Sequence, residues 1–393
     1  MNKNSDVYYG LISLTEDYLY SQSPQIDPKI NYNKVFSVSR EHNLASVVYC
    51  ALRNSSGVLT EKAFNESRGF FYDYIYLYEH QKYAMQELRK IFSQNKIRFV
   101  FFKGAVIREL YPVPESRVMG DIDVLIDKKN RKKVKALLKE AGYKCLSDNG
   151  SVWNYKKNSV EIEVHTRLIR GKTGANTKAE EFYSDAINHA VFNEFEGSFE
   201  KEYCFSFLIA HIAHHFWFYG AGIRQILDLA VLIKSQSLDF KLIEKYLADS
   251  GLLKFGKNIL GICTKWYALP LPYSCSNKEL ESFICSHGVF GGTNRNRGAV
   301  ITRKALEDGR GKSALQIKFD LLFPSYEKMC QIPYIKFIDG RRYLVLWAWI
   351  YRLFYNLLHR YNFVKNAASQ ISEKETAEMA AKEFNFFKEI GLL

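Results

Sequence analysis

Apolar residues at helical spacing dominate the first quarter of the chain. Between residues 8 and 95 they recur, for example at Leu77, Ala84, Leu88 and Ile91, which fall on one face of a helix. Aromatic side chains crowd the same region, and burial of each large one contributes about 1.5–3 kcal/mol to a fold. The pattern predicts a helical layer that packs against the next region, with recognition of a partner as the alternative role for these aromatics.

The pattern changes between about residues 96 and 180, where short β-rich runs alternate with helical segments. After the second run, Val134, Leu137, Leu138 and Ala141 have the spacing of an amphipathic helix. The first turns of this helix are rich in lysine and arginine, which indicates either a solvated face or a surface that faces phosphate. The runs that predict strands are IRFVFF (97–102), DIDVLI (121–126), SVWNY (151–155) and VEIEVH (160–165).

Helical periodicity returns after about residue 181. Ile209, Ile212, Ala213 and Phe216 form one apolar stripe, and a Gly- and Asn-rich stretch at 286–298 predicts a loop. We therefore predict an α+β fold in which helical regions flank a small mixed β-sheet. Its expected parts are an N-terminal helical region (1–95), an α/β core (96–180) and a C-terminal helical domain (181–393).

Composition narrows the range of partners. The 393 residues include 55 Lys and Arg against 42 Asp and Glu, a net charge of +13. This surplus favours anionic partners, which are nucleotides, nucleic acid or a phospholipid surface. The contents of 47% hydrophobic and 25% charged residues are ordinary globular values and exclude a largely disordered or fibrous chain.

The sequence also favours a cytoplasmic protein without a membrane span. The polar N-terminus is followed by no apolar stretch of signal-peptide length. The most apolar stretch, 343–358, is shorter than the roughly 20 residues that span a bilayer and contains Arg352, so we expect a buried or interfacial helix. Seven scattered cysteines without a CxxC pair indicate reduced thiols rather than a disulfide scaffold or a zinc cluster.

Two acidic strands carry the candidate chemistry. Side chains alternate along a strand, so Asp121 and Asp123 point the same way. Two neighbouring carboxylates stay ionised most easily around a hard divalent cation such as Mg²⁺. In the strand 160–165 the same alternation places Glu161, Glu163 and His165 on one face, which offers a third carboxylate. Three acids around two metal ions can activate an attacking oxygen and stabilise a leaving pyrophosphate.

A glycine turn lies between the first two strands. The strand at 97–102 leads into Lys103 and Gly104, where free backbone N–H groups at a helix start could receive phosphate oxygens. Lys103 and Arg117 add positive charge. We count Lys103, Gly104, Arg117 and His165 as nucleotide-binding candidates, while a plain tight turn with a solvated lysine is the alternative.

Three segments together resemble the uncharacterised nucleotidyltransferase family of the DNA polymerase β-like superfamily. They are FFKGAVIRELYPVPESRVMGDIDVLIDKKN, EIEVHTRL and HIAHHFWFYGAGIRQILDLAVLI. The resemblance implies a glycine turn for the triphosphate at Gly104, a metal-binding pair at Asp121 and Asp123, and Glu163 as the third acid. It implies two Mg²⁺ ions, with Mn²⁺ as the alternative. Gly104 is followed by Ala105 where the superfamily usually has serine, so a hydroxyl contact to phosphate is missing.

The expected activity is transfer of a nucleoside monophosphate from an NTP to an unidentified acceptor, with release of pyrophosphate. Asp121, Asp123 and Glu163 are the expected catalytic and metal-binding residues. The acceptor could be a small molecule, a saccharide, a protein or an RNA. A catalytically weak nucleotide-binding adaptor and a nucleic-acid-binding module that uses its basic surface are the competing hypotheses.

The segment 209–228 leaves two further questions. His211, His214 and His215 lie off the apolar stripe of their helix, which allows a structural or solvated role, a face lining the nucleotide cleft, or Zn²⁺ binding. Arg224 and Asp228 are four residues apart, which predicts an ion pair on a helix surface.

Overall fold

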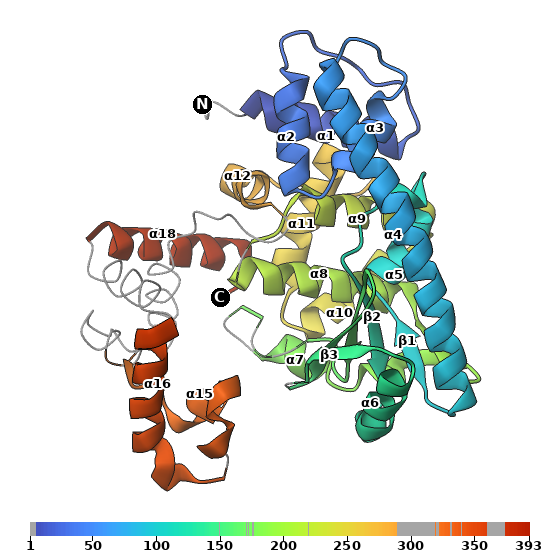
Figure 1. Cartoon of the computed structure of the whole chain (residues 1–393). Helices are drawn as coiled ribbons and strands as arrows, with labels where there is room; N and C mark the ends of the chain where they lie inside the picture. Colours follow the sequence, from blue (N-terminus) through green and yellow to red (C-terminus); the bar gives the residue numbers. More distant parts are fainter. Residues whose placement is uncertain are drawn as a thin grey trace. The chain divides into compact units, whose positions relative to one another are not determined.

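The structure is a computed structural model of the chain. It describes residues 5–148, 150–169, 171, 173–174, 177–218, 220–288, 319, 322–330, 332–338, 340–359 and 374–393. These residues belong to two compact units, of which the first comprises residues 1–292 and the second residues 293–391 (Figure 1). Most of the loop expected at 286–298 lies outside the described residues.

The N-terminal part of the first unit is helical, as the apolar spacing predicts. Two of its helices begin at side chains that accept a backbone N–H, because Asn31 receives the N–H of Lys34 and Thr60 that of Ala63. Such caps satisfy donors that have no partner within the helix. The helices are α1 (Ser5–Leu19), α2 (Tyr32–Glu41), α3 (Ala45–Leu52) and the long α4 (Glu61–Gln94).

A mixed β-sheet forms the centre of the first unit. Within the described residues it has seven strands in the order β3-β4-β5-β2-β1-β7-β6, so β2 is the middle strand. β2 pairs in parallel with β5 and antiparallel with β1, while β1 pairs in parallel with β7. The strands are β1 (Phe99–Phe101), β2 (Asp121–Ile126), β3 (Lys144–Ser147), β4 (Val152–Lys157), β5 (Val160–His165), β6 (Ala190–Asn193) and β7 (Glu196–Phe199).

One face of the sheet is covered by α4 and by α6 (Arg131–Glu140), as Figure 1 shows. Ile122, Val124 and Ile162 from the strands pack there with Leu88 of α4 and Leu138 of α6, and all five are essentially inaccessible to solvent. The alternation of apolar and acidic residues along β2 and β5 therefore sends the apolar set to this core and the acids to the opposite face. The lysine-rich helix α6 lies on the face away from the acids.

Helices after the sheet build a second core in the first unit. The apolar stripe predicted at Ile209, Ile212, Ala213 and Phe216 is buried. The helices are α7 (Lys178–Phe182), α8 (Lys201–Phe218), α9 (Ile223–Ser235), α10 (Phe240–Asp249), α11 (Leu253–Trp266) and α12 (Lys278–His287). Shorter helical turns are α5 (Gly104–Ile107), η1 (Arg108–Leu110), η2 (Pro114–Ser116), η3 (Lys128–Asn130) and η4 (Ala186–His189).

The second unit has its own small core. Met329, Ile335, Ile338 and Ala348 are fully buried together. The stretch expected to form a buried or interfacial helix forms α16, and several of its apolar side chains are exposed, Trp347 by 68%. The elements are α15 (Tyr326–Cys330), η5 (Pro333–Ile338), η6 (Arg342–Leu344), α16 (Val345–His359) and α18 (Lys374–Ile390).

The fold class agrees with the prediction of an α+β protein with a mixed sheet flanked by helices. The hairpin of β6 and β7 is the main difference, because helices were expected after residue 181. All seven cysteines lie in described positions and are free thiols. Among the helices that the structure describes, none is both long and apolar enough to cross a bilayer.

Candidate active site

Parallel pairing of β2 and β5 brings the acids together. The register aligns Asp121 with Glu161, Asp123 with Glu163 and Leu125 with His165. Because partners in register share a face, the carboxylates of two strands about 40 residues apart in the sequence meet on the side opposite the α4 core. All seven site residues expected from the sequence line one cavity of about 620 Å³; they are Lys103, Gly104, Arg117, Asp121, Asp123, Glu163 and His165.

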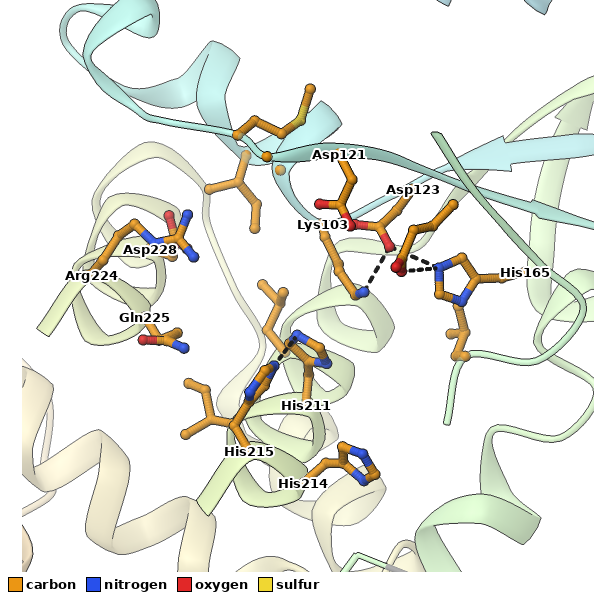
Figure 2. A pocket seen from close by; sticks show the side chains of 18 of the residues that line it. Lys103, Asp121, Asp123, His165, His211, His214, His215, Arg224, Gln225 and Asp228 are labelled. Atoms are coloured by element: carbon orange, nitrogen blue, oxygen red, sulfur yellow. Dashed lines mark hydrogen bonds and ion pairs between the residues drawn. The ribbon is translucent and has the colours of Figure 1, made fainter. Parts of the chain in front are cut away.

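Asp123, Glu163 and His165 form the tightest group of polar atoms in this cavity. His165 Nε2 lies 2.8 Å from Asp123 Oδ1 and 3.3 Å from Glu163 Oε2. Lys103 Nζ donates to the same Asp123 oxygen at 2.7 Å (Figure 2), and Asn154 donates to Glu163 Oε1 at 3.1 Å. One atom from each of Asp123, Glu163 and His165 lies within 4.8 Å of the others. The acids therefore converge as the sequence predicts, with a histidine added to the group.

The neighbours give the two aspartates opposite acidities. Burial would raise the pKa of Asp123, but Lys103 and His165 outweigh it and lower that pKa to about 2. Burial, together with the charges of Asp123 and Glu163, raises the pKa of Asp121 to about 6. Asp123 is therefore the carboxylate that the protein itself neutralises, whereas Asp121 carries an uncompensated negative charge at neutral pH.

His165 and Glu163 form the second coupled pair. Burial would lower the pKa of His165, but its contacts with Asp123 and Glu163 raise it. The contact with His165 lowers the pKa of Glu163. Glu161, by contrast, pairs with Lys156 at 2.7 Å, and both side chains are 44% exposed. The strand pattern allowed either Glu161 or Glu163 to be the third acid, and Glu163 is the one that lies beside Asp123.

The carboxylates and His165 suit a divalent cation. Neither ring nitrogen of the buried His165 makes a well-aligned hydrogen bond within the described part of the chain, although Nε2 is close to two carboxylate oxygens. Carboxylate oxygens and an imidazole nitrogen grouped this closely can act as ligands of one ion. The Lys103 ammonium already provides one positive charge at this point. Asp123 and Glu163 therefore offer oxygen donors, and His165 a nitrogen donor, that fit a metal ion.

A side chain at position 104 would displace its neighbours at the strand-to-helix turn. A Cβ atom at this position would lie 2.6 Å from Arg117 Nη1 and 2.9 Å from Met119 Sδ. The preceding residue, Lys103, has a φ of +52°, a backbone conformation that residues other than glycine rarely adopt. In this turn the side chain of Lys103 points towards Asp123, and the guanidinium group of Arg117 packs against Gly104.

Arg117 is held by a buried network. Its Nε and Nη2 donate to the two oxygens of Asp228 at 3.1 and 2.8 Å, and Tyr111 Oη donates to Asp228 Oδ1 at 2.7 Å. The prediction of a surface ion pair between Arg224 and Asp228 is therefore wrong. Asp228 is buried, and its carboxylate is occupied by a residue 111 positions earlier, a contact that helix spacing cannot reveal.

The segment that leads into β2 is fixed from α4. Gln81 Nε2 donates to the carbonyl oxygen of Met119 at 2.8 Å, and the buried Arg108 donates to Gln81 Oε1 at 2.8 Å. Arg108 also lies over the ring of Tyr78, with its guanidinium carbon 4.5 Å from the ring centroid. These contacts set the position at which β2 begins, and with it the position of Asp121.

The histidines of α8 face the cavity, one of the three roles that the sequence left open. His211, His214 and His215 all line it. The Nε2 atoms of His211 and His215 are 3.0 Å apart, the distance of one N–H···N hydrogen bond. Burial and the nearby Lys103 lower the pKa of His211, and lower that of His215 to about 4. Both rings are therefore neutral at pH 7.

Sequence reasoning missed Arg224, Tyr111, Asp228 and Asn154 as parts of the site. Arg224 and Asp228 were visible only as neighbours on a helix, and Tyr111 and Asn154 carried no pattern. One signal in the sequence could have identified Arg224. It lies nine positions after His215, close in the chain to the histidines that were expected to line the cleft. In Figure 2 Arg224 lies at one side of the cavity and His165 at the other.

Comparison with protein families gives one match. A family described as uncharacterised nucleotidyltransferase matches residues 28–268, which include both acidic strands, the glycine turn and the helices α8 and α9. Searches among curated proteins and among solved structures found no match.

Proposed function

Because the chain belongs to the uncharacterised nucleotidyltransferase family, we propose that it transfers a nucleoside monophosphate from an NTP to a hydroxyl or phosphate acceptor in a Mg²⁺-dependent reaction. The observation that carries this proposal is the group formed by Asp123, Glu163 and His165 in the 620 Å³ cavity. An acceptor oxygen forms a bond to the α-phosphorus and gives up any proton it carries to solvent. The bond between the α-phosphorus and the oxygen that bridges to the β-phosphate breaks, and pyrophosphate leaves.

Each residue has a role in this reaction. When bound, Mg²⁺ supplies positive charge at the attacking and leaving oxygens. Asp121 and Asp123 would hold both ions, and Glu163 would complete the ion on the acceptor side and orient the attacking oxygen. His165, expected from sequence as a nucleotide contact, is assigned here to positioning Asp123 and Glu163, since it touches both. Lys103 holds Asp123 ionised through their ion pair, and we assign its ammonium group to the phosphates of the NTP.

The test is transfer itself. The full chain is incubated with each α-labelled NTP, Mg²⁺ and a cell extract, and label incorporation and pyrophosphate release are measured together. We expect both signals to disappear with EDTA and in Asp123→Asn. Glu161→Gln is the matched control, because it removes a similar charge from β5 outside the cavity and should keep both signals.

The negative outcomes are also informative. If NTP with Mg²⁺ raises the melting temperature but no acceptor is labelled and no pyrophosphate appears, the nucleotide-binding adaptor becomes the better description. If NTP with Mg²⁺ and NTP with EDTA shift the melting temperature equally, the metal assignment fails.

A further inference from the structure

Arg224 presents part of its guanidinium group to the cavity without a protein partner. It is the second residue of α9, and Nη1 donates to the carbonyl oxygen of Val118 at 2.9 Å. Within the described residues Nε is buried and makes no hydrogen bond, and no carboxylate forms an ion pair with Arg224. The other arginines that line the cavity are paired, Arg117 with Asp228 at 2.8 Å and Arg167 with Glu180 at 3.6 Å.

The surroundings of Arg224 favour an anion. Burial lowers its pKa, and the nearby Arg117 adds to this effect. Asp228 does not neutralise Arg224 directly, because its two oxygens accept from Arg117 and Tyr111. The guanidinium donors of Arg224 are not all used by the protein, and such donors are suited to bind phosphate oxygens.

The alternatives along the same wall are weaker. The first N–H groups of α9 are already bound, since Gly222 N–H donates to Gln225 Oε1 and Ile223 N–H donates to His42 Nδ1. The helix end itself is therefore occupied. His211 and His215 bond to each other and lie near the Lys103 ammonium, which disfavours a second cation there.

We propose that Arg224 binds the β- and γ-phosphates of the NTP and stabilises the pyrophosphate as it leaves. This inference rests on the proposed nucleotidyl transfer and extends it, because it assigns a phosphate contact to the helical part of the first unit. Charge develops on the leaving oxygen during transfer, so a donor at this point acts most strongly in the transition state.

The inference predicts which part of the nucleotide Arg224 recognises. Binding of the NTP that stabilises the protein most is compared with binding of its monophosphate, with Mg²⁺ present throughout. In Arg224→Gln we expect the Kd for the NTP to rise by about tenfold or more, the effect of losing one charge-assisted contact, and the Kd for the monophosphate to change by less than about threefold. Inorganic tripolyphosphate should lose affinity in parallel with the NTP.

Two further variants separate recognition from general effects. Arg167→Gln is the matched control, because it removes the same charge from the same cavity at a residue that has its own carboxylate partner. It should leave the ratio of the two Kd values unchanged. Arg224→Lys keeps a donor for the carbonyl oxygen of Val118 and is expected to fold even if the glutamine variant does not. Its affinity for the NTP should fall by less than that of Arg224→Gln.

The outcomes distinguish the two proposals. If the wild type binds no NTP, the proposed function fails and this inference with it. If the wild type binds NTP and the ratio of the Kd values is the same in a folded Arg224 variant as in the wild type, Arg224 does not recognise the β- and γ-phosphates, and the proposed function stands. Equal loss for NTP and monophosphate would also overturn the inference.

Discussion

Replacing Asp121 with asparagine is expected to stabilise the metal-free protein at neutral pH while it abolishes transfer. The reason is the raised pKa of about 6, which burial and the charges of Asp123 and Glu163 produce. A carboxylate that is harder to ionise in the folded state than in the unfolded state opposes folding whenever it is charged. The proposed function therefore requires a charge that destabilises the fold.

The magnitude follows from the shift. The pKa of Asp121 rises from 3.8 to about 6, and each unit corresponds to about 1.36 kcal/mol, so the charge costs about 3 kcal/mol of unfolding free energy. Asparagine keeps the shape of the side chain but leaves a partly buried amide to be solvated, which reduces the gain to about 1–2 kcal/mol. For a unit of this size we expect the melting temperature to rise by about 2–4 °C.

The stability that Asp121→Asn gains over the wild type is largest above pH 6 and decreases as the pH falls. Above pH 6 Asp121 is charged in both states, and the advantage of the asparagine variant is complete. As the pH falls from 6 towards 3.8, the folded state takes up a proton that the unfolded state still lacks, and the wild type recovers. Below 3.8 the residue is neutral in both states and the difference disappears.

Urea unfolding with EDTA at pH 7.5 and at pH 4.5 measures this effect. Asp123→Asn is the matched control and should destabilise the protein at pH 7.5, because Lys103 and His165 hold the pKa of Asp123 at about 2. The reasoning is refuted if Asp121→Asn is less stable than the wild type at pH 7.5, or if its advantage is equally large at both pH values.

Three further predictions concern other residues. Glu163→Gln should lower kcat by orders of magnitude and Glu161→Gln by less than about twofold in a pyrophosphate-release assay; equal effects would exclude Glu163 as the third acid. The ring resonances of His215 should not titrate between pH 5.5 and 8 in NMR spectra, since its pKa is lowered to about 4, and a midpoint near 6.5 would contradict the buried pair. Asp228→Asn should cost about 3–5 kcal/mol in urea unfolding, because it leaves Arg117 buried without its partner, and a loss below 1 kcal/mol would contradict the buried network.

The two acidic strands could be predicted because alternation fixes both their bounds and their faces. The runs expected at 121–126 and 160–165 coincide with β2 and β5. The hairpin of β6 and β7 was missed because its strands have four residues each, too few to show a period. Its turn includes Glu194 at a φ of +55°, a conformation that a glutamate in the sequence does not predict.

The set of side chains that lines the candidate site was predictable, but the contacts that hold some of them in place were not. Strand alternation placed Asp121 with Asp123, and helical spacing placed the histidines off the apolar stripe. Spacing could not predict that Arg117 reaches Asp228, because that contact depends on how α9 packs beside the segment before β2. Contacts that depend on how helices pack against distant segments were thus accessible only from the structure.

Because of the register of β5, the effect of one inserted residue on the site depends on where it falls in the chain. One extra codon between Val160 and Glu163 would turn both Glu163 and His165 to the opposite side of the sheet, since side chains alternate with a period of two. The same codon in the hairpin turn at 158–159 would leave every pairing of β2 with β5 in place. We therefore expect an insertion to be tolerated in this turn and to disrupt the site when it falls between Val160 and Glu163.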